Sequence, residues 1–212
     1  MGKYSNGILG AFSGKVGPVV GSSWRGKAYI RSYTKKIHNP QTPLQMMQRA
    51  KVSIVAKFIS PVRGIINVGW KQYAHGMTPG NAATKYMLAN AIIGDYPNYD
   101  IDPEKVLISS GSLATATNAT ATFADGKVTF AWDDNSGVSS AAPTDKALIA
   151  VINPEKSEAV YLDSAAERST TTIDISLPTH WTGDTVICYL GFISENKKQT
   201  SNSLYLGEIN VS

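Results

Sequence analysis

The sequence predicts an α+β, mainly β protein, in which an N-terminal β-hairpin plus helices pack on a C-terminal immunoglobulin- or fibronectin-like β-sandwich. Three observations predict this class. Residues 18–33 contain two short apolar runs around a glycine turn. Residues 43–59 carry apolar side chains at helical spacing, and after Val106 the apolar residues alternate with a period of two.

The charges divide along the chain in a similar way. Residues 1–94 contain thirteen Lys and Arg and no acid, whereas residues 95–212 contain seven bases and sixteen acids. We therefore expect two parts with different partners. The first is a basic, glycine-rich hairpin and helical region over residues 1–97. The second is the sandwich, over residues 103–212.

The N-terminal part begins with a segment that disfavours a helix. Residues 5–26 contain six glycines, and each costs about 1 kcal/mol in a helix relative to Ala. Residues 18–24 and 28–33 are instead predicted to be strands, joined by a tight turn over residues 25–27. One face of the second strand is then expected to carry Tyr29, Arg31 and Tyr33, and the other face Ile30.

A helix is predicted next, because Thr42-Pro43-Leu44-Gln45 matches a capping box with proline at the first helical position. We expect it to run to about Ile59, ahead of Pro61. Its apolar stripe consists of Met47, Ala50, Ile54 and Phe58. Its other face carries Gln48, Arg49, Lys51 and Lys57, and residues 43–59 contain no acid.

Shorter helices and a loop are expected to complete this part. We predict a short helix over residues 63–68 and a second one over residues 81–93, which Thr78-Pro79-Gly80 would start. Residues 94–102 hold glycine, proline and the first acids, so we expect a loop and the boundary between the two parts there.

The C-terminal part is predicted to form about seven short strands. Asp125-Gly126 joins the strands of a hairpin, and residues 147–152 are apolar enough for a central strand. Trp132 is the expected aromatic anchor of the core. Because Cys188 is the only cysteine, the sandwich resembles the disulfide-free fibronectin-like domains, and Cys188 is expected to be a small core residue. The other strands are expected at residues 120–124, 127–132, 159–162, 171–177, 185–193 and 204–211.

Motifs of catalysis and of metal or cofactor binding do not emerge from the sequence. The segment from Gly21 to Lys27 matches part of a phosphate-binding loop, but Ala28 replaces the required Ser or Thr and a strand follows. The three histidines lack neighbours at metal-ligand spacing. We therefore expect no catalytic residue, no metal and no cofactor, and predict that the protein is not an enzyme.

The candidate site is the basic half with its interleaved aromatic residues. These side chains can neutralise phosphates and stack on bases, so nucleic acid is one candidate partner. They can also meet the acidic half of a neighbouring copy, which favours head-to-tail assembly. A third interpretation assigns the aromatic residues to a core and the bases to its solvated rim. The candidate residues are Trp24, Arg25, Lys27, Tyr29, Arg31, Tyr33, Lys35, Lys36, Arg49, Lys51 and Lys57.

Residues 12–33 and 39–51 resemble an uncharacterised family of Bacteroidota proteins of similar length. Trp-x-Gly-Lys at residues 24–27 and Asn-Pro-x-Thr-x-x-Gln-x-x-x-Arg at residues 39–49 also resemble small structural proteins of tailed phages and prophages. The second resemblance implies a virion or mobile-element particle subunit. We predict a non-enzymatic structural protein that self-associates or binds other particle subunits, with nucleic-acid binding as the alternative.

The expected location follows from the absence of recognisable targeting segments. The N-terminus lacks the apolar stretch of a secretory signal, and no run reaches the roughly 18 apolar residues of a membrane span. We expect synthesis in the cytoplasm, followed by action there or in a particle.

Overall fold

The computed structural model of the protein describes residues 2–4, 10–24, 26–35 and 39–212. The chain divides into two compact units, residues 1–42 and residues 43–212. The boundary that the sequence predicts near residues 97–103 stays a prediction, and a truncation experiment below addresses it.

The first unit is an antiparallel sheet in the order β1-β2-β3-β4. The predicted hairpin is present as β3 (Val19–Trp24) and β4 (Lys27–Ser32), with Val20 opposite Arg31. Two strands that the sequence analysis did not predict extend it, β1 (Lys3–Tyr4) and β2 (Phe12–Val16). The predicted turn includes Arg25, which lies outside the described residues.

The second unit begins with three helices. The predicted basic helix is confirmed as α1 (Pro43–Ile59), and a short helix follows as α2 (Arg63–Gly69). The third helix, α3 (Pro79–Asn90), begins after Thr78, whose Oγ1 accepts a hydrogen bond from the Asn81 amide at 3.2 Å. No single described helix is long and apolar enough to span a membrane, and only α1 with α2, bent by 92°, passes that test as a pair.

A hairpin follows α3 where the sequence predicted the end of a helix and a loop. It consists of β5 (Ile92–Asp95) and β6 (Asn98–Ile101), paired with Ile92 opposite Ile101. The prediction was wrong here because four-residue strands are too short to show their alternation clearly. Gly94 has a φ of +79°, and a Cβ at this position would meet the Asn98 carbonyl oxygen. A glycine with a positive φ is also typical of a loop, so this residue did not indicate a strand.

The remaining strands form the predicted sandwich. One sheet has the order β10-β9-β12-β13 and the other β11-β8-β7, the three-plus-four arrangement of a fibronectin-like domain. Trp132 is buried in its core and meets the Phe192 ring edge-on at a centroid distance of 5.6 Å. The strands are β7 (Thr117–Ala124), β8 (Lys127–Asp133), β9 (Lys146–Asn153), β10 (Glu158–Leu162), β11 (Thr172–Ser176), β12 (Thr185–Ile193) and β13 (Leu204–Asn210).

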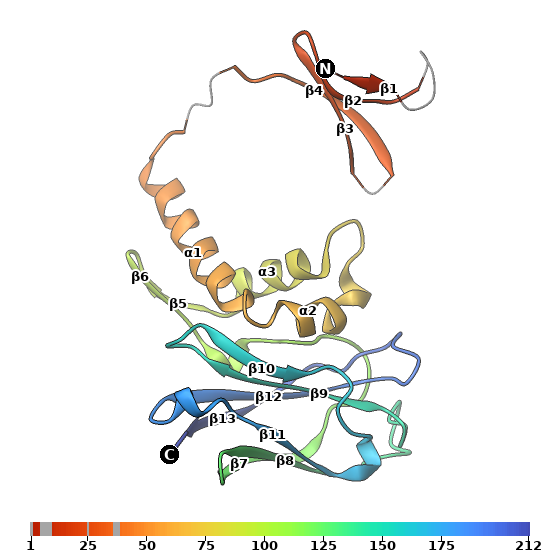
Figure 1. The fold of residues 1–212 in the computed structure, drawn as a ribbon, viewed down its shortest axis with the longest axis vertical. Coiled ribbons are helices and arrows are strands. Elements are labelled where there is room, and N and C mark those ends of the chain that lie inside the picture. The colour runs from red at the N-terminus through yellow and green to blue at the C-terminus, as the bar shows by residue number, and fades with distance from the viewer. Residues whose placement is uncertain (1, 5–9, 25, 36–38) are drawn as a thin grey trace. The chain divides into compact units, whose positions relative to one another are not determined.

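Strands β9 and β12 lie in the middle of a three-layer arrangement, with α1–α3 on one side and the three-stranded sheet on the other (Figure 1). Leu148, Ala150 and Ile152 of β9 belong to the core shared with the helices. The alternate residues Ile149 and Val151 belong to the core shared with β8 and β11. Burial on both faces explains why the sequence of β9 is a continuous apolar run.

Short 3-10 helices occupy several connections. They are η1 (Lys71–Tyr73), η2 (Pro103–Lys105), η3 (Arg168–Thr170) and η4 (Thr179–Trp181). The first residue of η3, Arg168, is fully buried in the sandwich, and its Nε donates to Asp145 Oδ2 at 3.2 Å. This connection therefore contributes an ion pair to the interior of the domain.

Candidate functional site

Most of the described residues of the first unit are exposed. Every residue of β4 is exposed, and Gly21 is the one buried residue among the described residues of this unit. A Cβ at Gly21 would lie 2.7 Å from the Phe12 ring and 2.2 Å from the Phe12 carbonyl oxygen, so the strands approach here as only glycine permits. This sheet therefore lacks a hydrophobic core of its own.

One face of the sheet is basic and aromatic. Trp24 pairs with Lys27, and Lys15 and Arg31 both pair with Val20, so these side chains project to the same side as Tyr29. The Lys15 ammonium lies 3.6 Å above the ring of Tyr33. Five of the predicted site residues thus share one face, namely Trp24, Lys27, Tyr29, Arg31 and Tyr33.

The opposite face of the sheet is apolar. Ile30 lies opposite Gly21, and Val16 lies opposite Val19, on the side that also carries Phe12. Ile30 is 65 % exposed and Val16 is 41 % exposed. An apolar sheet face of this kind is normally covered by another layer of protein.

The other predicted site residues divide between three places. Lys35 is exposed beyond β4, whereas Arg25 and Lys36 lie outside the described residues. Arg49, Lys51 and Lys57 belong to α1, in the second unit. The Lys51 ammonium lies 4.9 Å from the centroid of the Tyr99 ring on β6, and Lys57 lines a pocket.

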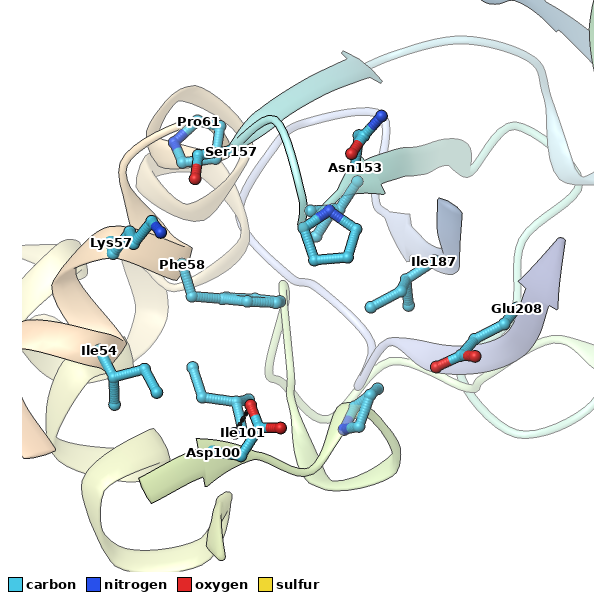
Figure 2. A pocket seen from close by; sticks show the side chains of 13 residues that line it. Ile54, Lys57, Phe58, Pro61, Asp100, Ile101, Asn153, Ser157, Ile187 and Glu208 are labelled. Carbon is cyan, nitrogen blue, oxygen red and sulfur yellow. Dashed lines mark hydrogen bonds between the residues drawn. The ribbon is translucent and has the colours of Figure 1, made fainter. Parts of the chain in front are cut away.

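This pocket lies between α1, the β5–β6 hairpin and the four-stranded sheet, and has a volume of about 320 Å³. Figure 2 shows Phe58 extending from α1 into the hollow, with Ile54 on the same helix, Ile101 on β6 and Ile187 across from them on β12. The lining is therefore mainly apolar. Its size is at the lower end of the roughly 300–1,000 Å³ typical of ligand sites.

Three charged side chains stand around the apolar lining. Asp100 comes from β6, Glu208 from β13 and Lys57 from α1, and all three residues are exposed. Figure 2 shows Glu208 on the side of the pocket away from Lys57. The pocket thus presents an apolar floor beneath a rim with one base and two acids.

Of the residues that line this pocket, Lys57 alone is among the predicted site residues. Its lining residues come from segments more than 150 residues apart, between Ile54 and Glu208. The acids of the rim lie in a segment that was predicted to be a loop and in the last strand. A correct prediction of the β5–β6 hairpin would have placed Asp100 on a strand, but it would not have brought Asp100 and Glu208 to the same pocket.

The titratable groups of the described residues do not form a metal site, since no group of three or more His, Cys, Asp or Glu among them could hold an ion. Cys188 lies in the core as predicted, and burial raises the pKa of its thiol to about 12. A thiol with so high a pKa is a poor nucleophile at neutral pH.

The sequence model that describes a protein family of unknown function (DUF6266) matches residues 11–207 of this chain. The chain belongs to this family. The match covers the basic sheet from β2 onward, the helices and the sandwich, which confirms the expected membership of an uncharacterised family. No curated protein matches the sequence.

Proposed function

We propose that this DUF6266 protein is a non-enzymatic structural subunit that self-associates through its basic N-terminal sheet. A phage-like or mobile-element particle is the setting that we propose for it. The resemblance of residues 24–49 to structural proteins of tailed phages supports that setting.

The observation that carries the proposal is the open sheet of the first unit. A sheet with an exposed apolar face and a single buried residue cannot supply its own stability, because sheets need a packed hydrophobic face. Ile30 and Val16 on one face, with Trp24 and Tyr29 on the other, are side-chain types that protein interfaces bury. Coverage by a neighbouring molecule accounts for their exposure.

The charge distribution supports another copy of this chain as the neighbour. The first unit contributes only bases, and all sixteen acids lie after residue 94. Contact between the basic sheet of one copy and the acidic half of the next is electrostatically complementary. Such a contact is head-to-tail, and repeating it generates a ring or a filament.

Light scattering of the purified protein across concentration and salt tests the proposal. We expect the mass to rise with protein concentration and to fall as salt screens the charges. A strict monomer at high concentration and low salt would overturn it.

Charge reversal provides the matched comparison. Lys27→Glu with Arg31→Glu should abolish the concentration-dependent mass, since both residues lie on the basic face. Lys197→Glu with Lys198→Glu reverses two exposed bases of the sandwich and changes net charge by the same amount. This control should assemble as the parent protein does. If both variants lose the concentration-dependent mass equally, assembly depends on net charge and not on the basic face.

A second candidate function is nucleic-acid binding, which the composition of the basic face favours. Lys15, Lys27 and Arg31 share that face with exposed Trp24 and Tyr29, so phosphates and bases could both find partners there.

Filter binding with single-stranded DNA and RNA at about 50 mM salt tests this candidate, and log affinity should fall linearly with log salt. If Lys27 contacts a phosphate, Lys27→Gln should reduce the slope of log affinity against log salt concentration by about 0.7 for a single strand. Absence of retention at low salt would remove the candidate.

A further inference from the structure

We infer that the pocket between α1 and the four-stranded sheet of one copy receives the tip of the β3–β4 hairpin of another copy, with Trp24 as the inserted side chain. This inference rests on the proposed self-association and assigns its two contact surfaces. In this interface, Trp24 of one molecule projects into the pocket of the next molecule.

Trp24 differs from the other tryptophans of the chain. It is 55 % exposed, whereas Trp70, Trp132 and Trp181 are 4 %, 4 % and 1 % exposed. Trp24 ends β3, and Lys27 begins β4 directly opposite it, so both stand at the end of the hairpin. Tryptophan is among the residue types that most often anchor protein interfaces.

The pocket suits this projection in shape and composition. Its volume of about 320 Å³ is lined by Ile54, Phe58, Ile101 and Ile187, which can cover both faces of an indole ring. The pocket is open to the surface, and Ile54, Phe58 and Ile101 are only half-buried there, so this part of its apolar lining contacts water. Filling it with an aromatic side chain removes apolar surface on both partners.

The charges around the two surfaces are complementary. Lys27 would enter beside the rim that carries Asp100 and Glu208, while Lys57 stands on the other side of the pocket from Glu208 (Figure 2). Because Glu208 lies away from Lys57, it can orient the hairpin by attracting Lys27. The same arrangement explains why the first unit, which contains no acid, would bind at this pocket and not elsewhere on the acidic half of a neighbouring copy.

Tryptophan fluorescence tests the inference directly, because Trp24 is the tryptophan that a quencher reaches in the free subunit. As concentration rises and light scattering reports assembly, we expect acrylamide quenching to fall and the emission to shift to the blue. Trp24→Ala should weaken self-association by roughly 30-fold or more, as loss of a central anchor does. Tyr73→Ala, at a 50 % exposed aromatic residue of η1, is the matched control and should assemble normally.

Mixing two disabled variants identifies the contact as projection into cavity. Trp24→Ala lacks the projection, and Asp100→Lys with Glu208→Lys repels Lys27 from the cavity. Each alone should be monomeric, whereas their equimolar mixture retains one intact contact and should form dimers without longer assemblies. Asp163→Lys with Glu195→Lys, two exposed acids elsewhere, keeps the same net charge as the cavity variant and should assemble. Thermal melts establish that every variant is folded.

The outcomes separate this inference from the proposed function. Assembly with Trp24 still open to quencher would overturn the inference and leave self-association standing. A monomer in which Trp24 is shielded at every concentration would mean that the hairpin occupies the pocket of its own chain, which overturns both. A monomer with Trp24 open to quencher overturns both as well.

Discussion

Arg168 has an unusual place for an arginine, because its side chain lies wholly inside the sandwich. Its guanidinium donates to Asp145 Oδ2 at 3.2 Å, to Asn135 Oδ1 at 2.6 Å and to the Ala114 carbonyl at 2.9 Å. The guanidinium carbon also lies 3.8 Å from the centroid of the Phe192 ring. Asp145 is 2 % exposed, so neither charge has water as an alternative partner.

Replacing Arg168 by alanine should therefore cost about 3–5 kcal/mol, because Asp145 would remain buried without its partner. Urea unfolding measures this change. Lys146→Ala is the control, since Lys146 pairs with Glu167 at 2.8 Å near the surface and its loss should cost about 0–1 kcal/mol. Equal costs for the two variants would contradict the buried-pair explanation.

Sequence analysis could not have found this pair. Arg168 stands in the polar stretch Ser164–Thr172, which has no periodicity that marks an inward side chain. Trp132 was predictable because the apolar positions of an alternating strand face the hydrophobic core, and Trp132 occupies one of them. Individual polar residues in connections are positioned by distant contacts, which local patterns do not contain.

At the scale of elements, α1 and α3 begin with the same Thr-Pro pair. At α3 the Thr78 hydroxyl caps the Asn81 amide at 3.2 Å, and proline at the next position needs no hydrogen-bond partner. We predict that Thr42 caps α1 in the same way.

Thr78→Ala and Thr42→Ala should each cost about 1 kcal/mol in unfolding experiments, and serine at either position should restore most of the loss. If Thr78→Ala is destabilising and Thr42→Ala is neutral, the capping-box prediction for α1 is wrong.

The β9–β10 turn is connected to η4 by a cluster of charged groups. The Lys156 ammonium bonds Asp184 and the His180 carbonyl, while Glu158 Oε2 accepts from Trp181 Nε1 at 2.8 Å and lies 2.7 Å from His180 Nε2. Hydrogen bonds from Lys156 and Asn153 lower the pKa of Asp184. Hydrogen bonds from Trp181 and His180 lower the pKa of Glu158.

A carboxyl whose pKa is lowered by folding stabilises the fold above its ordinary pKa and loses that contribution as pH falls through the lowered value. The ordinary values are 3.8 for Asp184 and 4.5 for Glu158, so the melting temperature should begin to fall below about pH 4.5. Asp184→Asn should flatten this acid decline, whereas Asn at exposed Asp163 should leave it unchanged. An unchanged acid decline in Asp184→Asn would contradict the assignment.

Most elements could be predicted because their patterns are long. α1 has seventeen residues with both a start motif and a following proline, and β9 and β12 are nearly continuous apolar runs. The β5–β6 hairpin, β1 and β2 were missed because strands of two to five residues display too little alternation to be recognised. The pocket was missed for a further reason, since its residues meet only after the helices pack on the sheet.

At the scale of the whole molecule, the helices form an outer layer of the second unit and contribute side chains to its hydrophobic core. Val55, Ile66 and Met87 share one core with Leu148, Ile152 and Tyr189 of the central strands. A chain cut at the predicted boundary near residues 97–103 would leave that sheet face uncovered. The compact unit that begins at residue 43 keeps the face covered.

Residues 43–212 alone should therefore melt within about 3 °C of the full chain, the shift that ~1 kcal/mol produces in a domain of this size. Residues 103–212 alone should aggregate or fail to fold, because the face around Leu148 and Ile152 becomes exposed. Circular dichroism and solubility measurements decide between the two boundaries. A soluble, cooperatively folding 103–212 fragment would support the boundary that the sequence predicts.

The burial of β9 and β12 on both faces also bears on how the protein is made. The helices end at Asn90, whereas the strands that cover them are complete only at Ile193. At translation rates of about 5–20 residues per second, synthesis of the chain from the end of α3 to the end of β12 takes roughly 5–20 s. During that interval the helix side chains that later pack on β9 and β12, among them Val55, Ile66 and Met87, remain uncovered. The helical part of this unit therefore cannot be covered on its sheet-facing side until residues far downstream in the chain have been synthesised.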